Sequence, residues 1–275
     1  MMKKILIAAA FLFVITGLWA QNFEGVISWT IKTDIKDPKM KAQMEEAQKR
    51  MNDPATQAQM KEMQARMQDP QFKAMMESNP QMKAQMEKMM NMANSGNMND
   101  MMPKGMTVKV KNRNTLTKMD GGMLAGEILY LNEKDVTYHI DRENKTYSVM
   151  GKGDDSDREM KGKVTATSES AKIQGYNCKK YIVELEEGGK SITQTVWATT
   201  EIKGLDMNSF SNQGVKGRKP TFYREIDGVP LKMEMSMPEM DMTMEVTGIK
   251  KQSLSAGDFV VPPGFKEVKG MFGMN

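Results

Sequence analysis

The chain has 275 residues, 32 of them methionine, and its 39 basic and 35 acidic residues leave a formal net charge of +4. A balance this close to neutral gives no reason to expect binding to nucleic acid or to an anionic membrane surface. One cysteine rules out an intramolecular disulfide, and one histidine rules out a metal site built from several imidazoles. The sequence contains no recognisable nucleophile or cofactor motif, so we expect a protein that is not an enzyme and needs no cofactor.

Residues 1–20 have the form of an export signal. Lys3 and Lys4 precede an apolar run from Ile5 to Trp19, and Ala20 is a small residue at the expected cleavage point. The run is short for a membrane span. We expect a cleaved signal peptide, a mature protein in the periplasm or outside the cell, and no integral membrane span after cleavage.

Residues 21–37 contain the first expected strand. Ile27, Trp29 and Ile31 alternate with polar residues, as in a strand with one buried face. The composition then changes over residues 38–104, and strand patterns resume over residues 105–268. We therefore interpret residues 38–104 as an insertion into a β-domain, and residues 269–275 as a tail.

The inserted segment carries a 16-residue repeat. Asp37-Pro38, Asp53-Pro54 and Asp69-Pro70 are equally spaced, and Asn79-Pro80 follows. Asp or Asn followed by proline favours a helix start, because the side chain accepts a backbone N–H bond and proline tolerates the first helical position. The three-four spacing of apolar residues predicts short helices with one methionine-lined face. The candidate ligand-binding residues on these faces are Met44, Met60, Met63, Met67, Phe72, Met76, Met86 and Met89.

Three roles fit such helices: a groove for an apolar guest, a self-packing cap or oligomerisation element of coiled-coil type, and a sink for metal or oxidant. The run DPATQAQMKEMQARMQDPQFKAMMESNPQMKAQMEKMM, residues 53–90, resembles the DP-type, heat-shock chaperonin-binding repeats of cochaperones and ubiquilins. That resemblance implies a chaperone-like bundle of short helices that holds apolar segments of client proteins.

The remaining chain predicts a series of short strands with short polar links, which favours antiparallel neighbours. We expect strands at 107–111, 115–119, 127–131, 136–140, 146–150, 164–170, 177–186, 191–199, 221–226, 231–237, 242–249 and 259–261. The long polar connection over residues 200–220 is a candidate ligand flap.

Four stretches carry a second resemblance: IQGYNCKKYIVEL at 173–185, VWATTEI at 196–202, the strand entry GVPL at 228–231 and FVVPPGFKEV at 259–268. They are similar to a secreted domain-of-unknown-function family of Gram-negative envelope proteins, of the GLPGLI kind. The resemblance implies a LolA/LolB-like fold, in which a helical layer covers a curved antiparallel sheet around an apolar cavity. The expected fold class is therefore α+β: a LolA-like antiparallel half-barrel of roughly ten or more strands, with an inserted module of short Met-rich helices.

The run KMEMSMPEMDMTMEV, residues 232–246, is a second methionine cluster. If it forms a hairpin, Met233, Met235, Met242 and Met244 share one face, with acidic residues on the other. That face is either the lining of a cavity or, since thioethers select soft ions, a site for Cu(I) or Ag(I). His139 is expected to be an ordinary strand residue, and Cys178 a buried structural thiol.

These observations favour a non-enzymatic envelope protein that binds apolar ligands, such as acyl chains, lipid or unfolded hydrophobic segments, through a Met-lined cavity and helical groove. A periplasmic Met-rich protein that binds Cu(I) or Ag(I) is one alternative. A structural module that forms oligomers through its Met-rich helices is another. The expected partner is an apolar ligand or a hydrophobic protein segment.

Overall fold

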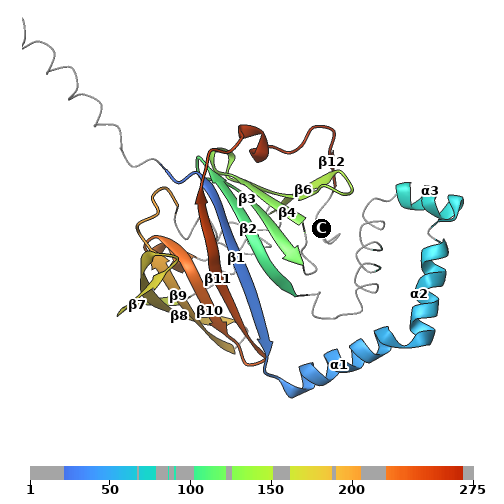
Figure 1. The fold of residues 1–275 in the computed structure, drawn as a ribbon, viewed down its shortest axis with the longest axis horizontal. Helices are drawn as coiled ribbons and strands as arrows, with labels where there is room; N and C mark the ends of the chain where they lie inside the picture. The colour runs from blue at the N-terminus through green and yellow to red at the C-terminus, as the bar shows by residue number, and fades with distance from the viewer. Residues whose placement is uncertain are drawn as a thin grey trace, which may run out of the picture.

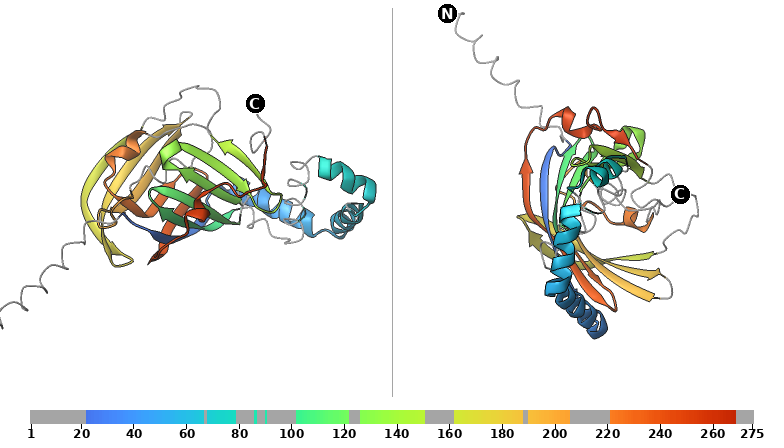
Figure 2. Two further views of the ribbon diagram at one scale, coloured as in Figure 1. Left: turned by 90° about the horizontal axis from the view of Figure 1, so that it is seen from above. Right: turned by 90° about the vertical axis from the view of Figure 1, so that its right-hand side faces the viewer.

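The computed structural model describes residues 22–66, 68–78, 86, 90, 102–121, 126–150, 162–187, 190–205 and 221–268. Their main feature is one 12-stranded sheet in the order β12-β6-β5-β4-β3-β2-β1-β11-β10-β9-β8-β7. The strands are β1 (Gly25–Ile35), β2 (Pro103–Lys111), β3 (Asn114–Gly121), β4 (Gly126–Leu131), β5 (Val136–Asp141), β6 (Thr146–Met150), β7 (Gly162–Ile173), β8 (Tyr176–Glu187), β9 (Lys190–Thr199), β10 (Val229–Ser236), β11 (Met240–Lys251) and β12 (Lys266–Glu267). The sheet curves into an open trough (Figures 1 and 2).

The first strand lies in the middle of this sheet. β1 pairs with β2 on one side and with β11 on the other, both antiparallel. We call β2 to β6 the first wing and β7 to β11 the second wing. Within each wing, consecutive strands are antiparallel neighbours. Among the described strands, only the short β12 pairs parallel, with β6. The prediction of antiparallel neighbours from short links is confirmed.

Two of the links are tight hairpin turns. Asn112 and Arg113, between β2 and β3, have φ angles of 51° and 64°. Gln174 and Gly175, between β7 and β8, have φ angles of 49° and 84°. Two successive residues with positive φ are typical of the type I′ turn, whose twist matches that of the flanking strands.

The two faces of the sheet carry separate apolar clusters. On the inner, concave face, Trp29 of β1 lies between Met106 of β2 and Val246 of β11, and all three are buried in one apolar cluster. On the outer face of the first wing, the C-terminal segment contributes Leu254 and Phe259 to a second cluster. Its sheet residues are Leu116, Leu129 and Ile140.

Three short 3-10 helices are described: η2 (Asn132–Lys134), η3 (Thr221–Glu225) and η4 (Ala256–Phe259). The last two replace segments that were predicted as strands. In place of the strand expected over 221–226, the Ile226 amide donates to the Tyr223 carbonyl, a bond three residues back in the chain that folds η3. The strand expected over 259–261 is replaced by the end of η4, because Pro262 and Pro263 lack the N–H groups that a ladder needs.

Three helices follow β1: α1 (Pro38–Asn52), α2 (Pro54–Arg66) and α3 (Pro70–Ser78). Each begins at an Asp-Pro pair, and the aspartate caps it. Asp37 Oδ1 accepts from the Met40 amide at 2.9 Å, Asp53 Oδ2 from the Thr56 amide at 3.2 Å, and Asp69 Oδ1 from the Gln71 amide at 2.8 Å. Ion pairs recur at the same 16-residue spacing, from Glu46 to Arg50 and from Glu62 to Arg66. Asn79-Pro80 lies outside the described residues.

These helices leave the sheet at the end of β1 and form an arc that extends away from it (Figure 1). Neither α1 nor α2 has a buried residue. The helical layer that the LolA/LolB resemblance implied is therefore not supplied by α1 to α3, which do not cover the concave face. Their apolar stripes are narrow, and proline turns the chain every 16 residues, so the three helices do not pack as a layer.

Candidate functional site

The second methionine cluster forms the expected hairpin. β10 and β11 pair antiparallel, with Met233 opposite Met244 and Met235 opposite Met242. Directly opposite residues point to the same face, so the four side chains lie together. The turn closes where the Met237 amide donates to the Met240 carbonyl at 3.0 Å. We call Met233, Met235, Met242 and Met244 the methionine quartet.

The quartet lies on the concave face. Met244 is opposite Ile31 of β1, and Met242 is opposite Thr33. On the other side of the hairpin, Met233 is opposite Val196 of β9. Met233 and Met244 pack against the buried cluster that contains Trp29.

Exposure changes along this face. Leu231 and Val246, at one end of the hairpin, are buried, whereas all four quartet side chains are half-buried. The hairpin therefore carries an apolar face that is closed at one end and partly accessible at the other. A half-buried apolar surface next to a buried core is a place where a ligand can add to that core.

A hydrogen-bonded pair, the buried Gln194 and the half-buried Tyr223, borders the quartet. Gln194 of β9 is only 3% exposed. Its Oε1 accepts from the Tyr223 hydroxyl at 2.7 Å, and its Nε2 donates to Met233 Sδ at 3.7 Å. Burial raises the pKa of Tyr223, so its hydroxyl stays protonated and donates at neutral pH. Sequence reasoning missed both residues, because Tyr223 was expected in a strand and Gln194 in an unremarkable polar alternation.

Polar side chains are buried on the concave face of β3, β5 and β6. They are Thr115, Thr117, Thr137, His139, Thr146 and Ser148, and they lie beside the apolar Val108 and Val110 of β2. Gly126 leaves room for the imidazole, since a Cβ there would lie 2.6 Å from His139 Nε2. His139 is thus a strand residue, as predicted, and it is also buried. The alternation of Thr and Ser with larger residues is visible in the sequence and could have shown this polar face.

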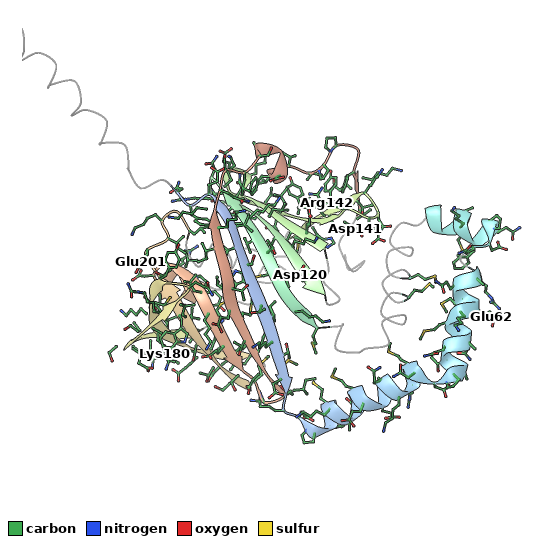
Figure 3. All side chains as sticks on the ribbon, viewed as in Figure 1. Glu62, Asp120, Asp141, Arg142, Lys180 and Glu201 are labelled. Carbon is green, nitrogen blue, oxygen red and sulfur yellow. The ribbon has the colours of Figure 1, made fainter. Side chains whose placement is uncertain are left out.

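The helices α1 to α3, which carry Met44, Met60, Met63, Phe72 and Met76, form an arc apart from the hairpin (Figure 3). Met44, Met60 and Met86 are half-buried, and Met63 is 40% exposed. Phe72 is half-buried and, with Met75 and Ala65, lines an open hollow between α2 and α3 that Glu62, Arg66 and Asp69 also border. Met67 and Met89 lie outside the described residues, and for Met76 only the backbone is described.

Cys178 is buried, as the sequence predicted. Its side chain is 1% exposed. Burial raises the pKa of the thiol to about 11, so it is neutral at physiological pH. Lys179, its neighbour in the chain, instead places its ammonium over the Tyr181 ring.

In the described residues, no three His, Cys, Asp or Glu side chains gather as a metal site would require. None of the helices described is long and apolar enough to cross a membrane.

Comparison with known proteins gives one family. The model of "Domain of unknown function (DUF4412)" matches residues 85–265, which include both wings and begin after β1 and α1 to α3. A search of the curated proteins gave no match. Among solved structures, LprF from Mycobacterium bovis is similar at 13% identity and a TM-score of 0.29, over 57% of this chain and 81% of that one. This score is too low to support any argument about the present chain. The prediction of a domain-of-unknown-function family is confirmed. Because the matched residues make up more than half of the chain, the chain belongs to the DUF4412 family.

Proposed function

We propose that this protein is a non-enzymatic binder of apolar ligands, and that it takes an acyl chain on the concave face beside the methionine quartet. The observation that carries the proposal is the register of β10 and β11, which places four half-buried methionines side by side at the accessible end of a buried apolar face. Tyr181, Val183 and Val196 continue the apolar surface across the second wing.

Methionine suits this task for a physical reason. Its side chain is unbranched and polarizable, so a surface made of it can adjust to the shape of a flexible chain. Each buried methylene contributes about 0.8 kcal/mol to binding, which is about fourfold in affinity. The buried polar side chains of the first wing, such as Thr117 and His139, favour the second wing as the side that receives the apolar part of the ligand.

The proposal includes export to the envelope or the cell exterior. It rests on the signal-like residues 1–20, which lie outside the described residues. In that setting an acyl-chain binder would serve lipid or lipoprotein transport. The LolA/LolB resemblance predicted from the sequence points to the same class of ligand.

Displacement of a fluorescent fatty acid by unlabelled fatty acids of increasing length tests the proposal. Between about ten and sixteen carbons, the dissociation constant should fall by about threefold to fourfold for each added methylene, until the face is filled. A dissociation constant that does not depend on chain length, or the absence of any displacement, would show that no acyl chain is bound.

A second candidate function belongs to the helices. Met63 and Met75 are 40% and 46% exposed, and Met75 lines the hollow beside Phe72 between α2 and α3. Such a surface favours binding of an unfolded hydrophobic segment or self-association of the helices.

To test both roles, residues 38–102 can be replaced by a flexible linker of about ten residues, long enough to join β1 to β2. Loss of binding to an unfolded client would support the first role, and loss of concentration-dependent mass the second. If neither property changes, the helices have neither role.

A further inference from the structure

The β10–β11 hairpin concentrates methionine on one part of the concave face. Elsewhere on this face most of the buried apolar residues are branched or aromatic, such as Ile27, Trp29 and Val108, and Met106 is a single methionine among them. Strands favour β-branched and aromatic residues, and methionine has no such preference. From Met233 to Met244, however, every residue of the two strands that points to the concave face is methionine. Apolar packing alone does not select this residue at each of these positions.

The register brings the sulfur atoms within reach of one another. Met233 is directly opposite Met244, and Met235 is directly opposite Met242 one step along the ladder. Directly opposite residues have Cβ atoms about 5 Å apart, and each methionine has three rotatable bonds. The four thioethers can therefore turn toward a common point between the two pairs.

Hard ligands are kept on the other face of the hairpin. Glu234 and Asp241 alternate with the quartet along the strands, so their carboxylates point to the convex side. Asp241 is held there by Lys36, at 2.7 Å, and by the Ser236 hydroxyl. A site made only of thioethers disfavours Mg²⁺, Ca²⁺ and Zn²⁺ and selects a soft monovalent ion.

We propose that Met233, Met235, Met242 and Met244 form an all-thioether binding site for Cu(I). An exported protein would meet copper in the envelope, and Cu(I) is the soft ion of biological abundance that thioethers select. The site is half-buried, so an ion can reach it from the accessible end of the concave face.

Gln194 and Tyr223 hold one of the four ligands in place. The Tyr223 hydroxyl fixes the orientation of the Gln194 amide, whose Nε2 donates to Met233 Sδ. A thioether sulfur has two lone pairs, so one can accept this bond while the other faces the ion. Such outer contacts orient metal ligands in proteins generally.

Ion binding is measured apart from acyl-chain binding, because the titration contains no fatty acid. Leucine matches methionine in volume and apolar surface but has no donor atom. A variant with Leu at all four quartet positions should therefore lose the ion. Retention of Cu(I) and displacement of the fatty-acid probe are separate measurements on the unmodified chain, so the failure of one proposal is distinguishable from the failure of the other.

Titration of the reduced full chain with Cu(I), without oxygen and against a chromogenic Cu(I) chelator, tests the site. The unmodified chain and the control variant Met63→Leu/Met75→Leu should both retain a Cu(I) ion. The four-leucine variant should bind the ion at least tenfold more weakly. Equal retention by the four-leucine variant, or no retention by the unmodified chain, would overturn the proposal.

If the four-leucine variant does not fold, the unmodified chain still decides the question. With ¹³C-labelled methionine methyl groups and Ag(I) as a redox-inert probe, the methyl signals of the quartet should shift at the first equivalent. The signals of Met63 and Met75 should shift only at higher ion concentration. Quartet signals that do not move at the first equivalent would exclude the site.

Discussion

At the scale of single residues, Glu24 links the start of β1 to β2 and to the segment that follows β11. Its carboxylate accepts from Lys111 Nζ at 2.7 Å and from the Leu254 amide at 2.6 Å. These bonds, led by the one from Lys111, hold the pKa of Glu24 below its ordinary value of 4.5. The carboxylate is therefore a stabilising group only while it is ionised.

The stabilisation that Glu24 provides depends on pH. A folded-state pKa below the unfolded value gives a stabilisation that is fully present above the unfolded pKa and is lost as pH falls through the folded pKa. The Tm difference between the unmodified chain and Glu24→Gln should be constant near neutral pH and should shrink below about pH 4.5. Thermal unfolding at a series of pH values measures it, with Glu62→Gln on the exposed α2 as the control. A Glu24→Gln difference that persists unchanged to pH 3 would contradict this role.

Cys178 gives a second prediction at this scale. A thiol whose pKa is raised to about 11 and whose side chain is 1% exposed has almost no thiolate at pH 8 and little access to reagent. Alkylation of the folded protein at pH 8 should be slower than that of the denatured protein by more than about a hundredfold. Labelling at similar rates in both states would show that the thiol is accessible and reactive.

At the scale of elements, the aspartate caps decide where the helices begin. Asp53 Oδ2 accepts from the amides of Ala55 and Thr56 at the start of α2. Because α2 has no buried residue, little tertiary packing can compensate for a lost cap. Asp53→Ala should cost about 1 kcal/mol locally and raise hydrogen exchange of the first α2 amides by about fivefold. Asn52→Ala, one residue earlier, is the control, and equal exchange in the two variants would mean that Asp53 is not the cap.

The strands could be predicted where one face is buried. Ile27, Trp29 and Ile31 are buried in β1 as their alternation indicated, and the hairpin of the second methionine cluster follows from the same rule. The helix starts could be predicted because the Asp-Pro chemistry is local.

The same reasoning failed where local pattern and packing disagree. TFYREI alternates like a strand, but Tyr223 and Ile226 are packed onto the second wing by η3. The bond from Tyr223 to Gln194 joins residues far apart in sequence, which no local pattern can show. The direction of the methionine helices relative to the sheet depends on turns rather than on periodicity, and was not predicted.

At the scale of the whole molecule, β1 connects two wings that are otherwise separate meanders. The family match covers both wings but begins after β1, so the strand that joins them comes from outside the matched residues. Both methionine-rich parts are attached near one end of this strand. Ile35, the last residue of β1, is opposite Met240 at the hairpin turn, and α1 begins at Pro38.

This arrangement separates two surfaces with different exposure. The quartet adjoins a buried core on the concave face, whereas the helical methionines of α1 and α2 are not part of any core. The acyl-chain site that we propose is therefore on the sheet rather than on the helices. Deleting the helices should leave fatty-acid affinity unchanged within about twofold, because the buried apolar area that provides it stays in place.

The most direct measurement compares two double variants of the same two strands. Met235→Gln/Met242→Gln changes one cross-strand pair on the concave face, and Glu234→Gln/Thr243→Gln changes the adjacent pair on the convex face. Glutamine is close to methionine in size but polar, so the concave variant should weaken binding of the fatty-acid probe by at least about tenfold, while the convex variant stays within about twofold. Equal affinity in the two variants would contradict the assignment of the acyl chain to the methionine quartet.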